Sequence, residues 1–91
     1  MTTSQNANNL HVYPNPINRG NITIAYKLTE NAYIQFKILD CTGREVIKIG
    51  DENKSAGDYN EQINTDNLAQ GVYLITANIN GEFKTIKFIK L

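Results

Sequence analysis

The side chains that could carry out nucleophilic catalysis are few in this chain and far apart in its sequence. The single histidine is His11, and the candidate nucleophiles are Cys41 and Ser55. A catalytic nucleophile needs a base within hydrogen-bond reach and a third group that orients the base. Surface loops of a 91-residue chain offer little preorganisation for such a set. The sequence therefore favours a protein that is not an enzyme.

Acidic side chains could in principle bind calcium or hydrolyse glycosides. Asp51, Glu52 and Asp58 could line a calcium loop, and so could Asp66 with nearby carbonyls, but the regular ligand spacing of such a loop is missing. Glu61 and Asp66 could form a pair of catalytic acids, yet nothing in the sequence places them across a groove. One cysteine and one histidine do not supply a zinc site. We expect no metal and no cofactor.

Five tyrosines could form a face that binds a sugar or a partner protein. Because side chains alternate between the two faces of a strand, Tyr26 falls with the core and Tyr33 on the opposite face. Tyr33 is thus the best candidate for an exposed aromatic side chain. The chain has no tryptophan, which weakens the case for a carbohydrate platform. The tyrosines are Tyr13, Tyr26, Tyr33, Tyr59 and Tyr73.

Composition limits the classes of function that remain. A chain of 91 residues suits one domain, and nine basic side chains balance nine acidic ones. This balance lacks the basic surface of a nucleic-acid-binding domain. No apolar run approaches the roughly 20 residues of a membrane span, and no signal peptide is recognisable. Cys41 is alone, so no internal disulfide can form.

The elements that position these side chains are expected to be strands. From Leu10 onward, apolar and polar residues alternate with a period near two, and turn residues interrupt the pattern about every 8–12 residues. The pattern predicts an all-β fold, an immunoglobulin-like β-sandwich of about seven antiparallel strands, with a closed barrel as the alternative. The runs cover residues 22–28, 32–38, 44–49, 59–64, 72–79 and 83–90, of which 72–79 is the strongest and 59–64 is weaker.

Short polar segments between the runs predict how neighbouring strands are joined. Residues 29–31 are short enough to close a hairpin between the two runs that flank them. Asp40 to Gly43 predicts a type I turn with Gly43 at positive φ. Asn80-Gly81 is a strong signal for a type I′ hairpin turn.

Three longer polar segments are expected to lie outside the strands. Residues 1–9 cannot fold alone and predict a flexible linker, which places the folded domain at residues 10–91. Residues 50–57 predict a surface loop. Residues 65–71 predict a tight crossing segment with room for one helical turn.

A proline motif marks the point where the linker meets the fold. In Tyr13-Pro14-Asn15-Pro16, each proline fixes φ and lacks a backbone donor, and it favours an extended conformation in the residue before it. Tyr13 and Asn15 should therefore be extended, and a strand cannot pass through the motif as a central member of a sheet.

Several motifs in fixed order give the chain a family resemblance. The proline motif comes first, a strand–turn–strand unit around Asp40 and Gly43 follows, and Gly71-Val72-Tyr73 opens the strongest strand. A last strand with Lys87 and Lys90 ends at Leu91. Over residues 10–91, this ordered set resembles the C-terminal sorting domain (type A) of type IX secretion substrates of Bacteroidetes.

The resemblance implies both a fold and a role. Such domains are seven-stranded immunoglobulin-like sandwiches that follow an N-terminal cargo protein, which this chain does not include. They direct the cargo across the outer membrane, where a sortase-type peptidase removes the domain and the cargo is attached to the cell surface. The implied partners are the outer-membrane translocon, a shuttle protein and that peptidase. The implied route runs through the periplasm to the outer membrane, the cell surface or the exterior.

The resemblance also implies roles for particular residues. Recognition by the secretion machinery is expected at Gly71, Tyr73, Lys87, Lys90 and Leu91, and a structural role at Pro14, Asn15, Pro16, Asp40 and Gly43.

Each of these residues also has a simpler structural interpretation. Gly71 would only supply a backbone conformation that side chains disfavour, and Tyr73 would belong to the core. Lys87 and Lys90 would be solvated lysines on opposite faces of the last strand.

Cys41 departs from the family pattern, which usually has a small or polar residue at this place in the turn. The alternative function is an accessory spacer or carbohydrate-binding β-sandwich of a secreted polysaccharide-degrading enzyme.

Overall fold

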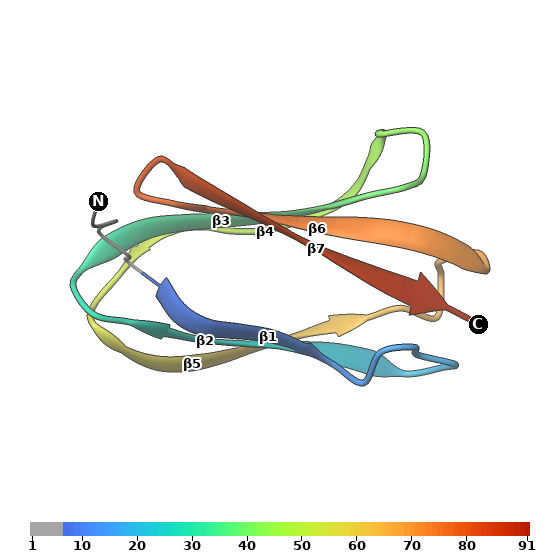
Figure 1. Cartoon of the computed structure of the whole chain (residues 1–91), viewed down its shortest axis with the longest axis horizontal. Helices are drawn as coiled ribbons and strands as arrows, with labels where there is room; N and C mark the ends of the chain where they lie inside the picture. The colour runs from blue at the N-terminus through green and yellow to red at the C-terminus, as the bar shows by residue number, and fades with distance from the viewer. Residues whose placement is uncertain (1–6) are drawn as a thin grey trace.

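The alternating sequence forms seven β-strands in the computed structural model, which describes residues 7–91 (Figure 1). The strands build two antiparallel sheets, one in the order β1-β2-β5 and the other in the order β4-β3-β6-β7. The predicted all-β sandwich of seven antiparallel strands is confirmed. The strands are β1 (Ala7–Tyr13), β2 (Asn21–Leu28), β3 (Ala32–Leu39), β4 (Glu45–Lys54), β5 (Gly57–Asn64), β6 (Gly71–Ile79) and β7 (Glu82–Lys90).

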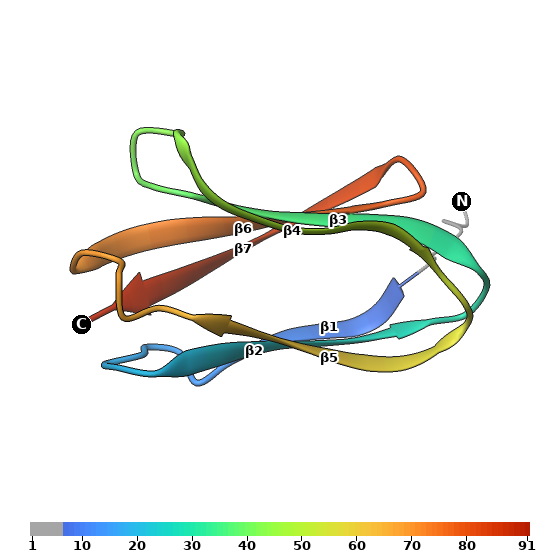
Figure 2. The ribbon, with the colours of Figure 1, turned by 180° about the vertical axis from the view of Figure 1, so that it is seen from behind.

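The two sheets stack face to face and share one hydrophobic core (Figures 1 and 2). Because side chains alternate along a strand, β2, β3 and β6 bury every second residue between the layers. Tyr26 lies in this core and packs on Phe36 with a ring-centroid distance of 5.1 Å. The largest fully buried apolar side chains are Phe36, Phe88, Ile22, Ile24, Leu28, Ile34, Ile38, Ile75 and Ile79.

Both predicted turns are present. In the β3–β4 turn, Gly43 has φ +89° and its N–H donates to the Asp40 carbonyl at 2.9 Å. Between β6 and β7, Asn80 and Gly81 have φ +50° and +89°, as a type I′ turn requires.

The predicted hairpin across residues 29–31 is wrong. β2 pairs with β1 and β5, whereas β3 pairs with β4 and β6, so these residues carry the chain from one sheet to the other. The alternation of apolar residues shows which face of a strand is buried, but it does not show which strand lies beside it. A short connection fits a crossing between layers as well as a hairpin.

The predicted surface loop at residues 50–57 is also wrong. β4 continues to Lys54 and β5 begins at Gly57, with only residues 55–56 between them. A β-bulge interrupts β4 where Gly50 and Asp51 have φ +85° and +63° and the register with β3 shifts. Because β4 is an edge strand with an exposed second half, polar residues are compatible with strand structure here.

The segment at residues 65–71 crosses from β5 to β6, as predicted. The Leu68 N–H donates to the Thr65 carbonyl at 2.9 Å, which closes a turn and not a helical segment. Most of the predicted linker lies outside the described residues, and β1 already includes residues 7–9.

Candidate recognition surface at the C-terminal strand

β7 is an edge strand, and part of its outer edge is covered by the proline motif. The Asn15 side chain donates from Nδ2 to the Lys87 carbonyl at 3.0 Å and accepts at Oδ1 from the Ile89 N–H at 3.1 Å. The Ile17 N–H donates to the Ile89 carbonyl at 2.9 Å, and the Ile17 carbonyl accepts from the Leu91 N–H at 2.8 Å. We call Asn15 and Ile17 the N-terminal clamp.

The residues on either side of Asn15 define the path of the chain through the clamp. β1 ends at Tyr13, so no strand passes through the proline motif, as predicted. The Tyr13–Pro14 and Asn15–Pro16 peptide bonds are both cis. Ile17 is only 2% exposed and anchors the segment in the core. Sequence reasoning missed Ile17, although an isolated apolar residue directly after the second proline was a usable signal.

The other edge of β7 pairs with β6, where the Gly-Val-Tyr motif lies. Gly71 is opposite Lys90, and Tyr73 is opposite Phe88. A Cβ on Gly71 would meet no other atom within 4 Å, so its φ of +157°, which side chains rarely adopt, is what favours glycine. Tyr73 is buried, stacks on Phe88 at 5.4 Å and donates its hydroxyl to the Ala69 carbonyl at 2.6 Å. The geometry of both residues fits a structural role.

The two lysines of the last strand lie in different environments. Lys87 is exposed on the outer face, and Leu91 beyond the strand is 55% exposed. Lys90 is only 6% exposed, with its Nζ 3.4 Å from the Thr65 Oγ1. The expectation of two solvated lysines therefore holds for Lys87 alone. Lys90 is buried because β7 turns its even-numbered side chains inward and its C-terminal end lies over the core.

Asp40 of the predicted turn lines a hollow beside the Gly-Val-Tyr motif. A hollow of about 600 Å³ has Asp40, Gly71 and Tyr73 in its wall. The Asp40 carboxylate accepts hydrogen bonds from the Thr42 hydroxyl at 2.6 Å and from the N–H groups of Thr42 and Arg44. These bonds, that of the Thr42 hydroxyl first, lower the pKa of Asp40. Asp40 thus stabilises its own turn.

The motifs that carried the family resemblance gather at one end of the sandwich. The proline motif, the β3–β4 turn, the start of β6 and the end of β7 lie at the end where Figure 1 marks the C-terminus, and Figure 2 shows the same arrangement from behind. The clamp bonds and the pairing of Gly71 with Lys90 join three of these segments directly.

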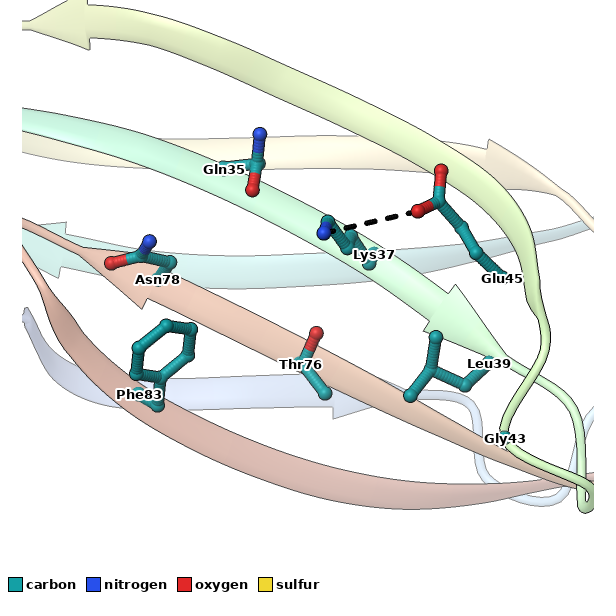
Figure 3. A pocket seen from close by; sticks show the side chains of 8 residues that line it. All are labelled: Gln35, Lys37, Leu39, Gly43, Glu45, Thr76, Asn78 and Phe83. Atoms are coloured by element: carbon teal, nitrogen blue, oxygen red, sulfur yellow. Dashed lines mark ion pairs between the residues drawn. The ribbon is translucent and has the colours of Figure 1, made fainter.

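A shallow groove of about 540 Å³ runs along the outer face of the four-stranded sheet (Figure 3). Lys37 and Glu45 form an ion pair of 3.8 Å at one side of it. Phe83 stands at the other side and is 72% exposed. The large exposed apolar residues among those described are Tyr13, Val72, Phe83, Ile89 and Leu91, and all but Tyr13 lie on β6 or β7 or directly after β7.

The acidic residues considered for catalysis are engaged in structural contacts. Glu61 accepts from the Tyr26 hydroxyl at 2.8 Å and lies 3.6 Å from the Lys54 ammonium. Burial, together with Glu61, raises the pKa of Tyr26. Lys54 also lies 4.6 Å from the ring centroid of Tyr59. Asp66 accepts from a backbone N–H of the β1–β2 loop at 2.8 Å.

The remaining candidate side chains do not form a site in the described part of the chain. His11, Cys41 and Ser55 are exposed, and no hydrogen bond joins any two of them. Residues 7–91 contain no group of three or more histidine, cysteine or acidic side chains that could hold a metal ion. Tyr33 lies half-buried on the outer face of its sheet.

Comparison with models of known protein families shows the family to which this chain belongs. Residues 11–91 match the model of the secretion system C-terminal sorting domain. The chain belongs to this family. No curated protein and no solved structure is significantly similar to the chain. The match runs from the middle of β1 to Leu91 and includes every motif that carried the resemblance.

Membership in the sorting-domain family defines the general role of the chain. The sorting domain acts as a signal for type IX secretion, so it interacts with that secretion system and accompanies export out of the cell. Sorting domains of this kind are in general not catalytic. No helix among the described residues is long and apolar enough to cross a membrane.

Proposed function

We propose that this sorting domain is a folded signal whose C-terminal end is read by the outer-membrane translocon and shuttle protein of the type IX system. The domain directs an N-terminal cargo protein from the periplasm across the outer membrane. A sortase-type peptidase then removes the domain, and the cargo is attached to the cell surface or released. The clamp of Asn15 and Ile17 on β7 is the observation that carries the proposal, because it holds the last residues in a fixed position.

The burial of the predicted recognition residues supports a division of labour among them. Lys87 and Leu91 are exposed and are proposed to contact the machinery. Gly71, Tyr73 and Lys90 lie behind them and are proposed to act by positioning the strand. A preorganised surface loses less conformational entropy on binding than a flexible tail does.

A reporter fusion tests the proposed function. A reporter with an ordinary export signal is joined to residues 7–91 and expressed in a host with type IX secretion. We expect the reporter outside the cell, and we expect it in the periplasm of the same host without a functional translocon. Periplasmic retention in the intact host would contradict the proposal. Binding of the purified domain to insoluble polysaccharide would favour the carbohydrate-binding alternative.

Point variants locate the signal on the domain. Deleting the last three residues is a poor test, because it removes the Ile89 and Leu91 partners of the clamp as well as the exposed side chains. We expect Lys87→Glu and Leu91→Glu to reduce export while the domain remains folded. The matched control is Lys27→Glu, which reverses an exposed charge on β2 in the other sheet.

A further inference from the structure

The outer edge of β7 is only half covered. The clamp bonds the Lys87 carbonyl, the Ile89 N–H and carbonyl, and the Leu91 N–H. Because backbone groups alternate in direction along a strand, the Lys87 N–H and both groups of Thr85 and Phe83 point to the same outer side. No described residue forms a hydrogen bond with these groups. This stretch is an exposed edge with unpaired donors and acceptors, which can pair with another strand.

The side chains beside this open edge are also incompletely covered. Ile86 and Lys84 face inward but are only half-buried, whereas Phe88 further along is completely buried. On the outer face, Phe83 is exposed at the side of the groove in Figure 3. A strand added along β7 would cover Ile86 on one face and pack against Phe83 on the other.

The charge of the open edge indicates the chemistry of its partner. Lys84 and Lys87 lie within the unpaired stretch, Lys84 on its inner face and Lys87 on its outer face, and neither forms an ion pair with a described residue. Opposite charges on neighbouring strands are favourable, and like charges are not. Pairing of β7 with β7 of a second copy of the chain would place four such lysines along one strand–strand interface, which is unfavourable. An acidic strand neutralises them.

The other sheet edges are less suited to strand addition. β4 is broken by the bulge at Gly50 and Asp51, and the pairing of β1 with β2 is irregular between Asn8 and His11. β5 is regular, but its exposed side chains are all polar and offer an added strand little apolar surface. They are Asp58, Asn60, Gln62 and Asn64.

We propose that residues 83–87 of β7 accept an extended segment of a protein partner, with acidic and apolar side chains on both of its faces, as a fifth strand of the β4-β3-β6-β7 sheet. Main-chain hydrogen bonds supply the affinity, and the lysines with Phe83 and Ile86 select the sequence. This inference rests on the proposed function, because it specifies how the secretion machinery binds the exposed side of β7.

Binding of a short peptide tests the pairing without any secretion assay. The probe is a peptide of about six residues, the usual length of a strand, made of two Glu-Val-Val repeats so that each face carries one glutamate. It is titrated into the labelled domain and followed by NMR. We expect the largest amide shifts at Phe83, Thr85 and Lys87. Two further peptides carry N-methyl groups on every second peptide bond, one on the odd-numbered and the other on the even-numbered bonds. Only the peptide whose methyl groups face β7 should lose binding. No shift, shifts elsewhere, equal binding of both N-methylated peptides, or self-association of the domain through β7 would overturn the proposal.

A proline variant carries the test into the cell. Thr85→Pro removes an outward N–H and leaves the ladder with β6 intact, as edge strands permit. Thr85→Val keeps the N–H and is the matched control. We expect Thr85→Pro to weaken peptide binding and reporter export by about tenfold or more, with Thr85→Val unchanged. The double variant Lys84→Glu with Lys87→Glu leaves the backbone unaltered, and we expect it to weaken peptide binding and export as well. It replaces the proline variant as the test if Thr85→Pro unfolds.

The outcomes separate the two proposals. If the wild-type fusion is exported and folded Thr85→Pro is exported equally, strand addition is wrong and the sorting function stands. If the wild-type fusion stays in the periplasm, the sorting function fails, and the pairing fails with it as a secretion contact.

Discussion

At the scale of single residues, Asn15 occupies the place that a neighbouring strand would have. Its amide donates to one β7 carbonyl and accepts from the N–H two residues further on, so one side chain satisfies two edge groups. Asparagine suits this role because its amide carries both a donor and an acceptor. The prolines on either side have no N–H of their own and restrict the backbone that presents it.

Replacing Asn15 should weaken the hold on the C-terminal strand. Asn15→Ala removes two hydrogen bonds in an exposed position, where water takes their place, so we expect the free energy of unfolding to fall by about 1 kcal/mol. Urea denaturation measures the loss, and hydrogen exchange at the Ile89 amide should become faster. Asn18→Ala is the control, because Asn18 is exposed and shows no side-chain hydrogen bond to a described residue. Equal effects of the two variants would contradict the clamp.

At the scale of elements, sequence reasoning succeeded where one residue determines a local conformation. Positive φ at Gly43 and at Asn80-Gly81 was readable from residue type, because side chains disfavour that region of φ. The buried faces of β2, β3 and β6 followed from alternation. These local preferences need no knowledge of distant residues.

Long-range pairing was not readable in the same way. The segment at residues 29–31 joins two sheets, and nothing in β2 or β3 says that their partners are β5 and β6. The bonds from Asn15 to β7 span more than 70 positions of sequence, with separations of 72 and 74. The candidate site residues could be named from the family resemblance, but the burial of Lys90 depends on the end of β7 lying over the core.

One side-chain hydroxyl of β6 helps to hold the segment that crosses from β5 to β6. The Tyr73 hydroxyl in β6 bonds to the Ala69 carbonyl four residues earlier. Tyr73→Phe keeps the ring on Phe88 but removes this bond, so we expect a loss of about 1 kcal/mol of stability in urea denaturation. Tyr33→Phe on the outer face should change stability by less than about 0.5 kcal/mol. Export should survive Tyr73→Phe; loss of export without unfolding would instead indicate direct contact through the hydroxyl.

At the scale of the whole molecule, one core joins both sheets, so the domain should unfold as a single unit. Ile24 in β2 and Ile75 in β6 are almost fully buried in different layers of that core. We expect Ile24→Ala and Ile75→Ala each to cost about 2–5 kcal/mol. In both variants, circular dichroism and tyrosine fluorescence should report one coincident urea transition. Ile89→Ala, at 37% exposure, is the milder control. Separate transitions for the two layers would show that the sheets fold independently.

The clamp also determines how the domain responds to mechanical force. The isolated bridge between Ile17 and Lys90 is parallel, so a pull on the cargo side of Ile17 and a pull at Leu91 act along the two segments in opposite directions. In this geometry the clamp bonds of Asn15 and Ile17 are sheared together and cannot be peeled apart one by one. The resistance of a domain to forced unfolding is governed by its unfolding rate. A domain pulled at both ends would therefore load the clamp bonds in shear, in addition to the pairing of β1 with β2.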